Sequence, residues 1–190
     1  PHKILAKSAQ ICDHKSCDDV TALYASTRRP VTVNIFTGPP ANPAKDKPVV
    51  ADFLTQPGPK VVCGATTAAI VAKHLKKQLS IEHDAKCLVS PPRYIIPEID
   101  LVTEGVVTLN QLSNIMDIDI SNTDQDSGVI DLYKLLQNAD RVNFTIGNSK
   151  NPANKDISFS QQGILTREKI VPVLIEKLKN KGKLIVQNNC

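Results

Sequence analysis

Residues 60–78, KVVCGATTAAIVAKHLKKQ, contain the pattern that decides the fold. The first four form a short run of apolar and β-branched residues, which predicts a buried strand. Gly64 ends that run, and residues 66–78, rich in Ala, Val, Ile and Leu, predict a helix. A strand followed at once by a helix is the repeating unit of α/β proteins.

The same alternation continues in both directions along the 190 residues. Strands are expected at residues 31–36, 60–63, 79–83, 99–103, 141–146 and 184–186, and helices at residues 45–54, 66–78, 108–116, 128–138 and 166–181. Hydrophobic residues make up 41% of the chain and aromatic residues only 4%, so the core is expected to be aliphatic. We therefore predict an α/β fold with a mostly parallel sheet and helices on both faces, in three layers.

Four of the expected strands are followed closely by a glycine, namely Gly38, Gly64, Gly105 and Gly147. Open α/β sheets bind ligands at the carboxyl ends of their strands, where glycine lets backbone amides approach a ligand. The four loops therefore form the candidate binding site. The alternative is that each glycine only permits the turn from strand to helix.

Ala65, Thr66 and Thr67 start the helix that follows Gly64 and provide the best candidate anion site. Free backbone amides, the positive end of a helix dipole and two hydroxyls suit a phosphate or a carboxylate. The spacing matches neither a P-loop nor a dinucleotide-binding fingerprint, so ATP is not indicated. The alternative is that Thr66 or Thr67 only caps the helix.

Two other residues at these strand ends carry reactive groups. Glu104 can bind a ligand hydroxyl or act as an acid or base, or it can simply cap the helix expected from residue 108. Cys63 lies beside a helix N-terminus, which favours a reactive thiolate, but as the last residue of a buried strand it can equally be an inert apolar residue. None of the four loops contains a histidine, so a Ser-His-Asp or Cys-His triad is not indicated.

Composition limits the partners and the location. A net charge of +4 without a dense basic stripe does not indicate nucleic acid. No run approaches the roughly 18 apolar residues of a membrane-spanning helix, and the first residues do not resemble a signal peptide, so a cytoplasmic protein with no membrane partner is expected. Five cysteines at irregular spacing favour reduced thiols. Residues 12–17 offer two cysteines and one histidine, fewer ligands than zinc normally requires.

The first 28 residues are expected to be separate from the rest. Residues 2–11 predict a short helix and residues 20–25 a strand, which together cannot bury a core. The polar residues 26–30, which end in a proline, predict a linker. We therefore divide the chain into residues 1–28 and an α/β domain at residues 29–190.

Residues 17–24, CDDVTALY, resemble the closing strand of the metal-dependent type 2C serine/threonine phosphatases, a class that includes stage II sporulation protein E. Residues 29–40, 60–68 and 99–105 resemble, in the same order, the accessory domain that follows such a phosphatase in some bacterial proteins. The resemblance therefore covers nearly the whole chain.

This resemblance implies that residues 1–28 are the C-terminal remnant of a phosphatase domain, in which Asp18 is a ligand of manganese or magnesium. The remaining ligands would lie on earlier strands, so this fragment is expected to hold no cofactor and to have no catalytic residue of its own. Two positions depart from the family pattern. Cys17 replaces the glycine usual before the acid pair, and Ala65 replaces the second glycine of a Gly-Gly-Thr-Thr motif.

The leading hypothesis is a regulatory or sensing accessory domain. Its expected partners are the attached phosphatase domain and an anionic, phosphorylated small molecule. The expected ligand-binding residues are Gly38, Gly64, Ala65, Thr66, Thr67, Glu104, Gly105 and Gly147. One alternative is a small transferase or hydrolase that uses Glu104, and another is a ligand-free module for homodimerisation or docking.

Overall fold

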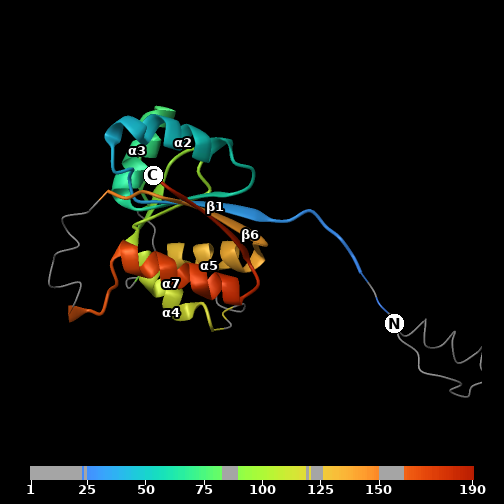
Figure 1. The fold of residues 1–190 in the computed structure, drawn as a ribbon. Coiled ribbons are helices and arrows are strands. Elements are labelled where there is room, and N and C mark those ends of the chain that lie inside the picture. Colours follow the sequence, from blue (N-terminus) through green and yellow to red (C-terminus); the bar gives the residue numbers. More distant parts are fainter. Residues whose placement is uncertain (1–22, 24, 83–89, 119, 121–125, 150–160) are drawn as a thin grey trace, which may run out of the picture.

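The computed structural model describes residues 23, 25–82, 90–118, 120, 126–149 and 161–190. In this part of the chain, seven strands form one sheet in the order β3-β4-β5-β2-β1-β6-β7 (Figure 1). β1, β2, β5, β6 and β7 are parallel, whereas β4 runs antiparallel to β3 and β5. The bounds are β1 (Thr32–Thr37), β2 (Lys60–Cys63), β3 (Ser80–Ile81), β4 (Arg93–Ile95), β5 (Leu101–Thr103), β6 (Arg141–Ile146) and β7 (Leu184–Asn189).

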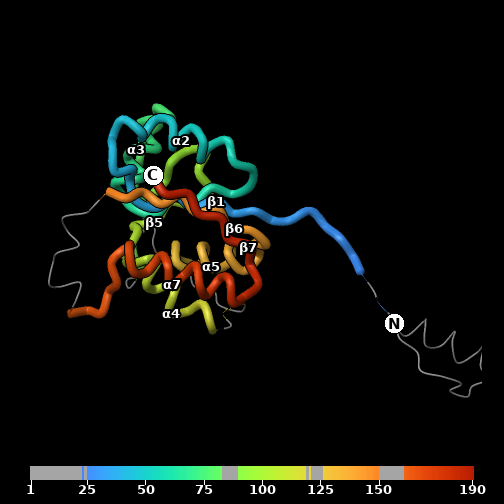
Figure 2. The backbone as a smooth tube through the Cα atoms, in the orientation of Figure 1, coloured from blue at the N-terminus to red at the C-terminus, as the bar shows by residue number. Residues whose placement is uncertain are grey.

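Helices cover both faces of this sheet. One face carries α2 (Asp46–Thr55), which follows the short 3-10 helix η1 (Pro43–Lys45), and α3 (Ala65–Leu75). The opposite face carries α4 (Val106–Ile115), α5 (Gly128–Asn138) and α7 (Arg167–Asn180), as Figures 1 and 2 show. The predicted three-layer α/β fold with a mostly parallel sheet is confirmed.

Two hydrophobic cores flank the sheet because successive side chains of a strand point to opposite faces. In β1, Val33 and Ile35 belong to the core formed with α4, α5 and α7, whereas Phe36 belongs to the core formed with α2 and α3. The ring centroid of Phe36 lies 5.5 Å from that of Phe53 in α2. Most other core side chains are aliphatic, which fits the low aromatic content.

The chain changes the direction in which it adds strands at β1. From β1 it passes through α2 to β2 and on towards β5, whereas β6 and β7 lie on the other side of β1. In open α/β sheets, ligands bind in the crevice that such a reversal creates at the carboxyl ends of the strands. The loops that follow β1, β2, β5 and β6 are therefore the expected borders of a binding crevice.

The sheet edge beyond β5 differs from the sequence prediction. The hydrophobic pattern does not predict β4, because three residues are too few to show a period of two. Arg93, the first residue of β4, forms ion pairs with Asp126 at 2.8 Å and with Asp131 of α5 at 2.5 Å. It also pairs with Glu82 after β3. A charge cluster therefore anchors this edge.

Several predicted boundaries shift by a few residues. α3 begins at Ala65 and ends at Leu75, before the predicted end at residue 78, because Lys76 adopts a left-handed φ of 56°. β5 begins at Leu101 rather than at residue 99, and β7 extends to Asn189 rather than ending at residue 186. The order of the elements is unaffected.

The linker before β1 is tied to the domain through one carboxylate. The Arg28 guanidinium donates hydrogen bonds of 2.6 and 2.7 Å to Asp140, which also accepts a 2.7 Å bond from the Val31 amide. Residues 25–30 are irregular and exposed, as expected for a linker. Asp18 and nearly all of the 1–28 segment lie outside the described residues, so the metal-ligand role of Asp18 stays a prediction.

No helix in the described ranges has the length and apolar character needed to cross a membrane. No group of three or more His, Cys, Asp or Glu side chains in the same ranges is placed to hold a metal ion.

Candidate functional site

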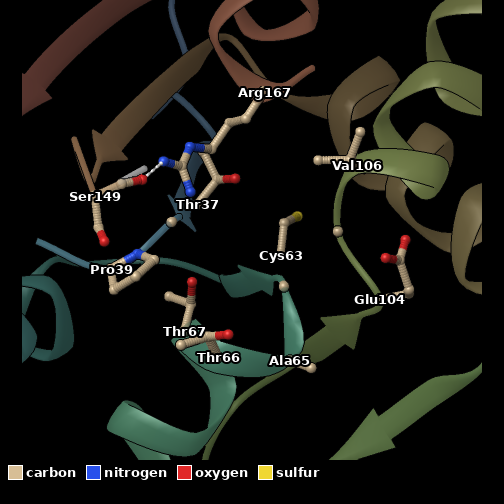
Figure 3. Close-up of a pocket in the computed structure, with 13 residues that line it drawn as sticks. Thr37, Pro39, Cys63, Ala65, Thr66, Thr67, Glu104, Val106, Ser149 and Arg167 are labelled. Atoms are coloured by element: carbon tan, nitrogen blue, oxygen red, sulfur yellow. Dashed lines mark hydrogen bonds between the residues drawn. The ribbon is translucent and has the colours of Figure 1, made fainter. Parts of the chain in front are cut away.

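A pocket of about 330 Å³ opens at the carboxyl ends of β1, β2 and β5 (Figure 3). Most of the ligand-binding residues predicted from the sequence line it, namely Gly38, Gly64, Ala65, Thr66, Thr67, Glu104 and Gly105. The remaining lining residues are Thr37, Pro39, Cys63, Val106, Ser149 and Arg167. The glycines after β1, β2 and β5 thus mark the position of the pocket.

Gly147, the glycine after β6, is not part of this lining. A Cβ atom on Gly147 would overlap the backbone carbonyl oxygens of Gly38 and Pro39. Its amide donates a 3.0 Å hydrogen bond to the Thr37 carbonyl. Gly147 therefore lets the loops after β1 and β6 pack closely. Although the sequence predicts Gly147 as a ligand-binding residue, it does not line this pocket.

The loops after β2 and β5 approach one another through two glycines. Gly105 has a φ of 132°, and a Cβ atom there would lie only 2.9 Å from the Cα of Gly64. The Gly64 amide also donates a 3.0 Å hydrogen bond to the Thr103 carbonyl. This close approach holds the N-termini of α3 and α4 next to each other at the pocket.

α3 begins at the pocket without a side-chain cap. Gly64 is its N-cap residue, and neither Thr66 nor Thr67 accepts a capping hydrogen bond from the backbone. Thr67 is 1% exposed, and its hydroxyl has no hydrogen-bond partner among the described residues. The capping alternative therefore does not account for these threonines, and no described side chain caps the positive end of α3, which lies at the pocket.

Arg167 is a pocket residue that the sequence interpretation missed. It is the first residue of α7 and is 8% exposed, and its guanidinium donates a hydrogen bond to the Ser149 carbonyl. Burial lowers the pKa of Arg167, whereas charge interactions with Glu168 and Cys190 oppose this shift, and no described carboxylate lies within ion-pair distance of the guanidinium. A buried cation without an anionic partner is costly, because the energy of desolvation is not recovered.

A sequence signal for Arg167 does exist. The helix dipole disfavours a cation in the first turn of a helix, so an arginine directly after the predicted N-cap Thr166 is unusual. Thr166 holds that N-cap position, but its side chain makes no capping hydrogen bond. An arginine in this place is better explained by what it faces than by the helix that carries it.

Glu104 lies beside the first turn of α4. Its Oε2 atom accepts a 3.1 Å hydrogen bond from the Val107 amide, so the carboxylate caps α4. Burial raises the pKa of Glu104, and hydrogen bonds from the amides of Val107 and Thr108 oppose this shift. The site therefore combines one buried cation, one positive helix end and a half-buried carboxyl group at its edge.

Cys63 forms part of the pocket floor between these groups. Its side chain is buried, and burial raises the pKa of the thiol to about 12. The neighbouring helix N-terminus does not overcome this effect. Of the two interpretations of Cys63, the structure favours the inert apolar residue over the nucleophile.

Comparison of the chain with protein-family models, with curated proteins and with solved structures finds no match in any of the three.

Proposed function

We propose that residues 29–190 are a regulatory or sensing accessory domain that binds an anionic, phosphorylated small molecule at the carboxyl ends of its strands. One observation carries the proposal. The buried Arg167 guanidinium and the N-terminus of α3 line the same pocket, and among the described residues Arg167 forms no direct ion pair and no side chain caps α3. An anion bound there would offset the cost of both.

Two features of the lining favour binding over turnover. The Glu104 carboxylate is occupied in capping α4, and the Cys63 thiol is protonated at neutral pH because of its raised pKa. The acidic and sulfur groups of the pocket are therefore engaged or unreactive, whereas its hydrogen-bond donors are available.

The regulated partner in this proposal is an upstream phosphatase domain of the type 2C class, with manganese or magnesium in its own active site. The support for it is the resemblance of residues 17–24 to the closing strand of that class. Arg28 is the last residue of the expected remnant, and its bidentate ion pair with Asp140 joins the linker to the α/β domain. A change in the domain can thus reach the linker through a defined contact.

A thermal-shift screen against phosphorylated, carboxylated and neutral metabolites tests the proposal. We expect anionic compounds to stabilise the chain, by about 2.7 kcal/mol at a concentration 100 times the dissociation constant. The double substitution Thr66→Val, Thr67→Val should remove this stabilisation.

The matched control is Thr108→Val, since Thr108 is a buried threonine in the first turn of α4 and does not line the pocket. It should leave the ligand-induced shift unchanged. The proposal is wrong if no phosphorylated or carboxylated compound stabilises the folded protein.

A further inference from the structure

The pocket has two walls that present hydrogen-bond donors from different elements. Arg167 extends from the start of α7 on one side, and Thr66 and Thr67 lie in the first turn of α3 on the other, with Cys63 between them (Figure 3). The number and directions of these donors limit the chemical class of ligand that can accept hydrogen bonds from both walls.

The Arg167 wall is a charged donor fixed in place. Its guanidinium packs against Gly38 so closely that a Cβ atom on Gly38 would overlap it, and the Ser149 carbonyl accepts one of its hydrogens. A guanidinium is planar and carries several N–H donors, so others remain available to a ligand. Because Arg167 is only 8% exposed, water does little to satisfy them.

The α3 wall adds neutral donors with no partner in the described part of the chain. The amides of Ala65, Thr66 and Thr67 belong to the first turn, where the helix itself offers no acceptor. The hydroxyl of Thr67 is buried and unpartnered, and in Figure 3 it lies on the side of the turn that faces Arg167. This buried hydroxyl is evidence for a ligand that does not depend on the helix terminus.

The pocket offers more hydrogen-bond donors than a planar carboxylate can accept, since a carboxylate has about four lone-pair positions. These donors are three backbone amides, two threonine hydroxyls and the remaining guanidinium hydrogens. A phosphate monoester has three terminal oxygens that point in different directions and carries close to two negative charges. It can therefore contact both walls at the same time. A phosphodiester has only two free oxygens and carries a substituent in place of the third.

Glu104 limits the rest of the ligand. Its carboxyl group lies at the pocket beside the start of α4. A second anionic group next to this carboxylate would be repelled. The site therefore disfavours molecules with clustered phosphates.

We propose that the pocket holds the terminal phosphate of a small phosphomonoester between the Arg167 guanidinium and the N-terminus of α3, so that the donors of the two walls together favour phosphate over carboxylate. This inference rests on the proposed function and specifies its ligand class.

Titration of the 190-residue chain with methyl phosphate, dimethyl phosphate and acetate at pH 7.5, followed by amide chemical shifts, tests the inference. We expect methyl phosphate to bind at least about tenfold more tightly than the other two. Arg167→Met should weaken the binding of methyl phosphate by about tenfold or more. Arg167→Lys should weaken this binding less, because the positive charge is kept. Arg29→Met removes an exposed arginine outside the pocket and is the matched control. The same spectra establish that each variant is folded.

The outcomes separate this inference from the function on which it rests. If acetate binds as tightly as methyl phosphate, the phosphomonoester class is wrong while anion sensing survives. If methyl phosphate binds but Arg167→Met binds it equally well, the assignment of Arg167 is wrong. If the folded chain binds none of the anions and the metabolite screen is also negative, both proposals are wrong.

Discussion

Asn143 of β6 donates a 2.8 Å hydrogen bond from its side-chain amide to the side-chain oxygen of Asn34 in the neighbouring strand β1. Asn34 is 1% exposed and donates in turn to the Pro57 carbonyl, at 2.8 Å. Arg141 donates a 2.8 Å bond to the Asn143 side chain. A chain of polar contacts thus links β1 and β6, the two strands between which the order of strand addition reverses.

Substitution Asn143→Ala should destabilise the protein by about 1–3 kcal/mol, because it leaves the buried Asn34 oxygen without its donor. The measurement is urea unfolding followed by circular dichroism. Asn138→Ala, at an exposed position at the end of α5, is the control and should change stability little. Equal unfolding midpoints for both variants would contradict the role of the asparagine pair.

Gly38→Ala should impair anion binding as well as stability. Gly38 has a φ of 78°, which costs about 1–2 kcal/mol for alanine, and its new methyl group would displace the Arg167 guanidinium. Gly182→Ala is a close match, since Gly182 has a φ of 76° but nothing lies within 4 Å of a Cβ atom there.

Comparison of the two alanine variants by thermal unfolding and phosphate titration separates strain from contact. Both variants should be less stable because of the strained backbone. Only Gly38→Ala should also bind phosphate more weakly and lose further stability because its methyl group clashes with Arg167. Shortening the arginine in the double variant Gly38→Ala, Arg167→Ala should recover that additional loss. No recovery would mean that the two residues do not interact as described.

The ion pair between Arg28 and Asp140 should make stability depend on pH in the acid range. Hydrogen bonds from Arg28 and from the Val31 amide lower the pKa of Asp140 below its ordinary value. A carboxyl group with a lowered folded-state pKa adds stability above its unfolded-state pKa, and this contribution is lost as pH falls through the folded-state value. Carbon-detected NMR titration of Asp140 should show the lowered pKa, and Arg28→Gln should raise it towards the ordinary range. The same pKa in both proteins would refute the coupling.

Cys63 should resist alkylation in the folded protein. With a thiol pKa of about 12, the difference of about four units at pH 8 leaves on the order of one molecule in 10,000 as thiolate. Treatment with iodoacetamide and peptide mass mapping should find Cys63 unmodified in the native chain and modified in urea. Rapid modification of the native protein would restore the nucleophile interpretation.

The sequence pattern was sufficient for the fold because the relevant signals are local. Residues such as Val61, Val62 and Ile70 carry the period of their element wherever it lies in the chain, and Gly64 marks the turn between strand and helix. β4 escaped prediction for the opposite reason. Arg93–Ile95 forms a strand by pairing with β3 and β5, and Arg93 also contacts carboxylates from α5 and from Glu82 after β3. These are contacts with distant parts of the chain, and the three-residue segment itself carries no signal of them.

The same distinction explains what was found and missed in the candidate site. The loops that contain Gly38, Gly64 and Gly105 could be grouped from the sequence, since parallel strands place their carboxyl ends at one edge. Arg167 could not be assigned to them, because it lies more than 60 residues after Gly105 and reaches the pocket only through the packing of α7. Gly147 shares the strand-end pattern, but it does not line this pocket and allows the close packing of two loops.

The contact between Arg28 and Asp140 lies at the amino-terminal end of β1, whereas the pocket opens after its last residue, Thr37. A strand of six residues separates the two by roughly 20 Å. In Figure 1 residues 25–31 leave the sheet on the side away from the start of α3. Attachment of the protein to a surface through the exposed residues 25–30 should therefore leave the pocket open to the flowing solution, so that surface-based binding measurements and those made in free solution give the same affinity.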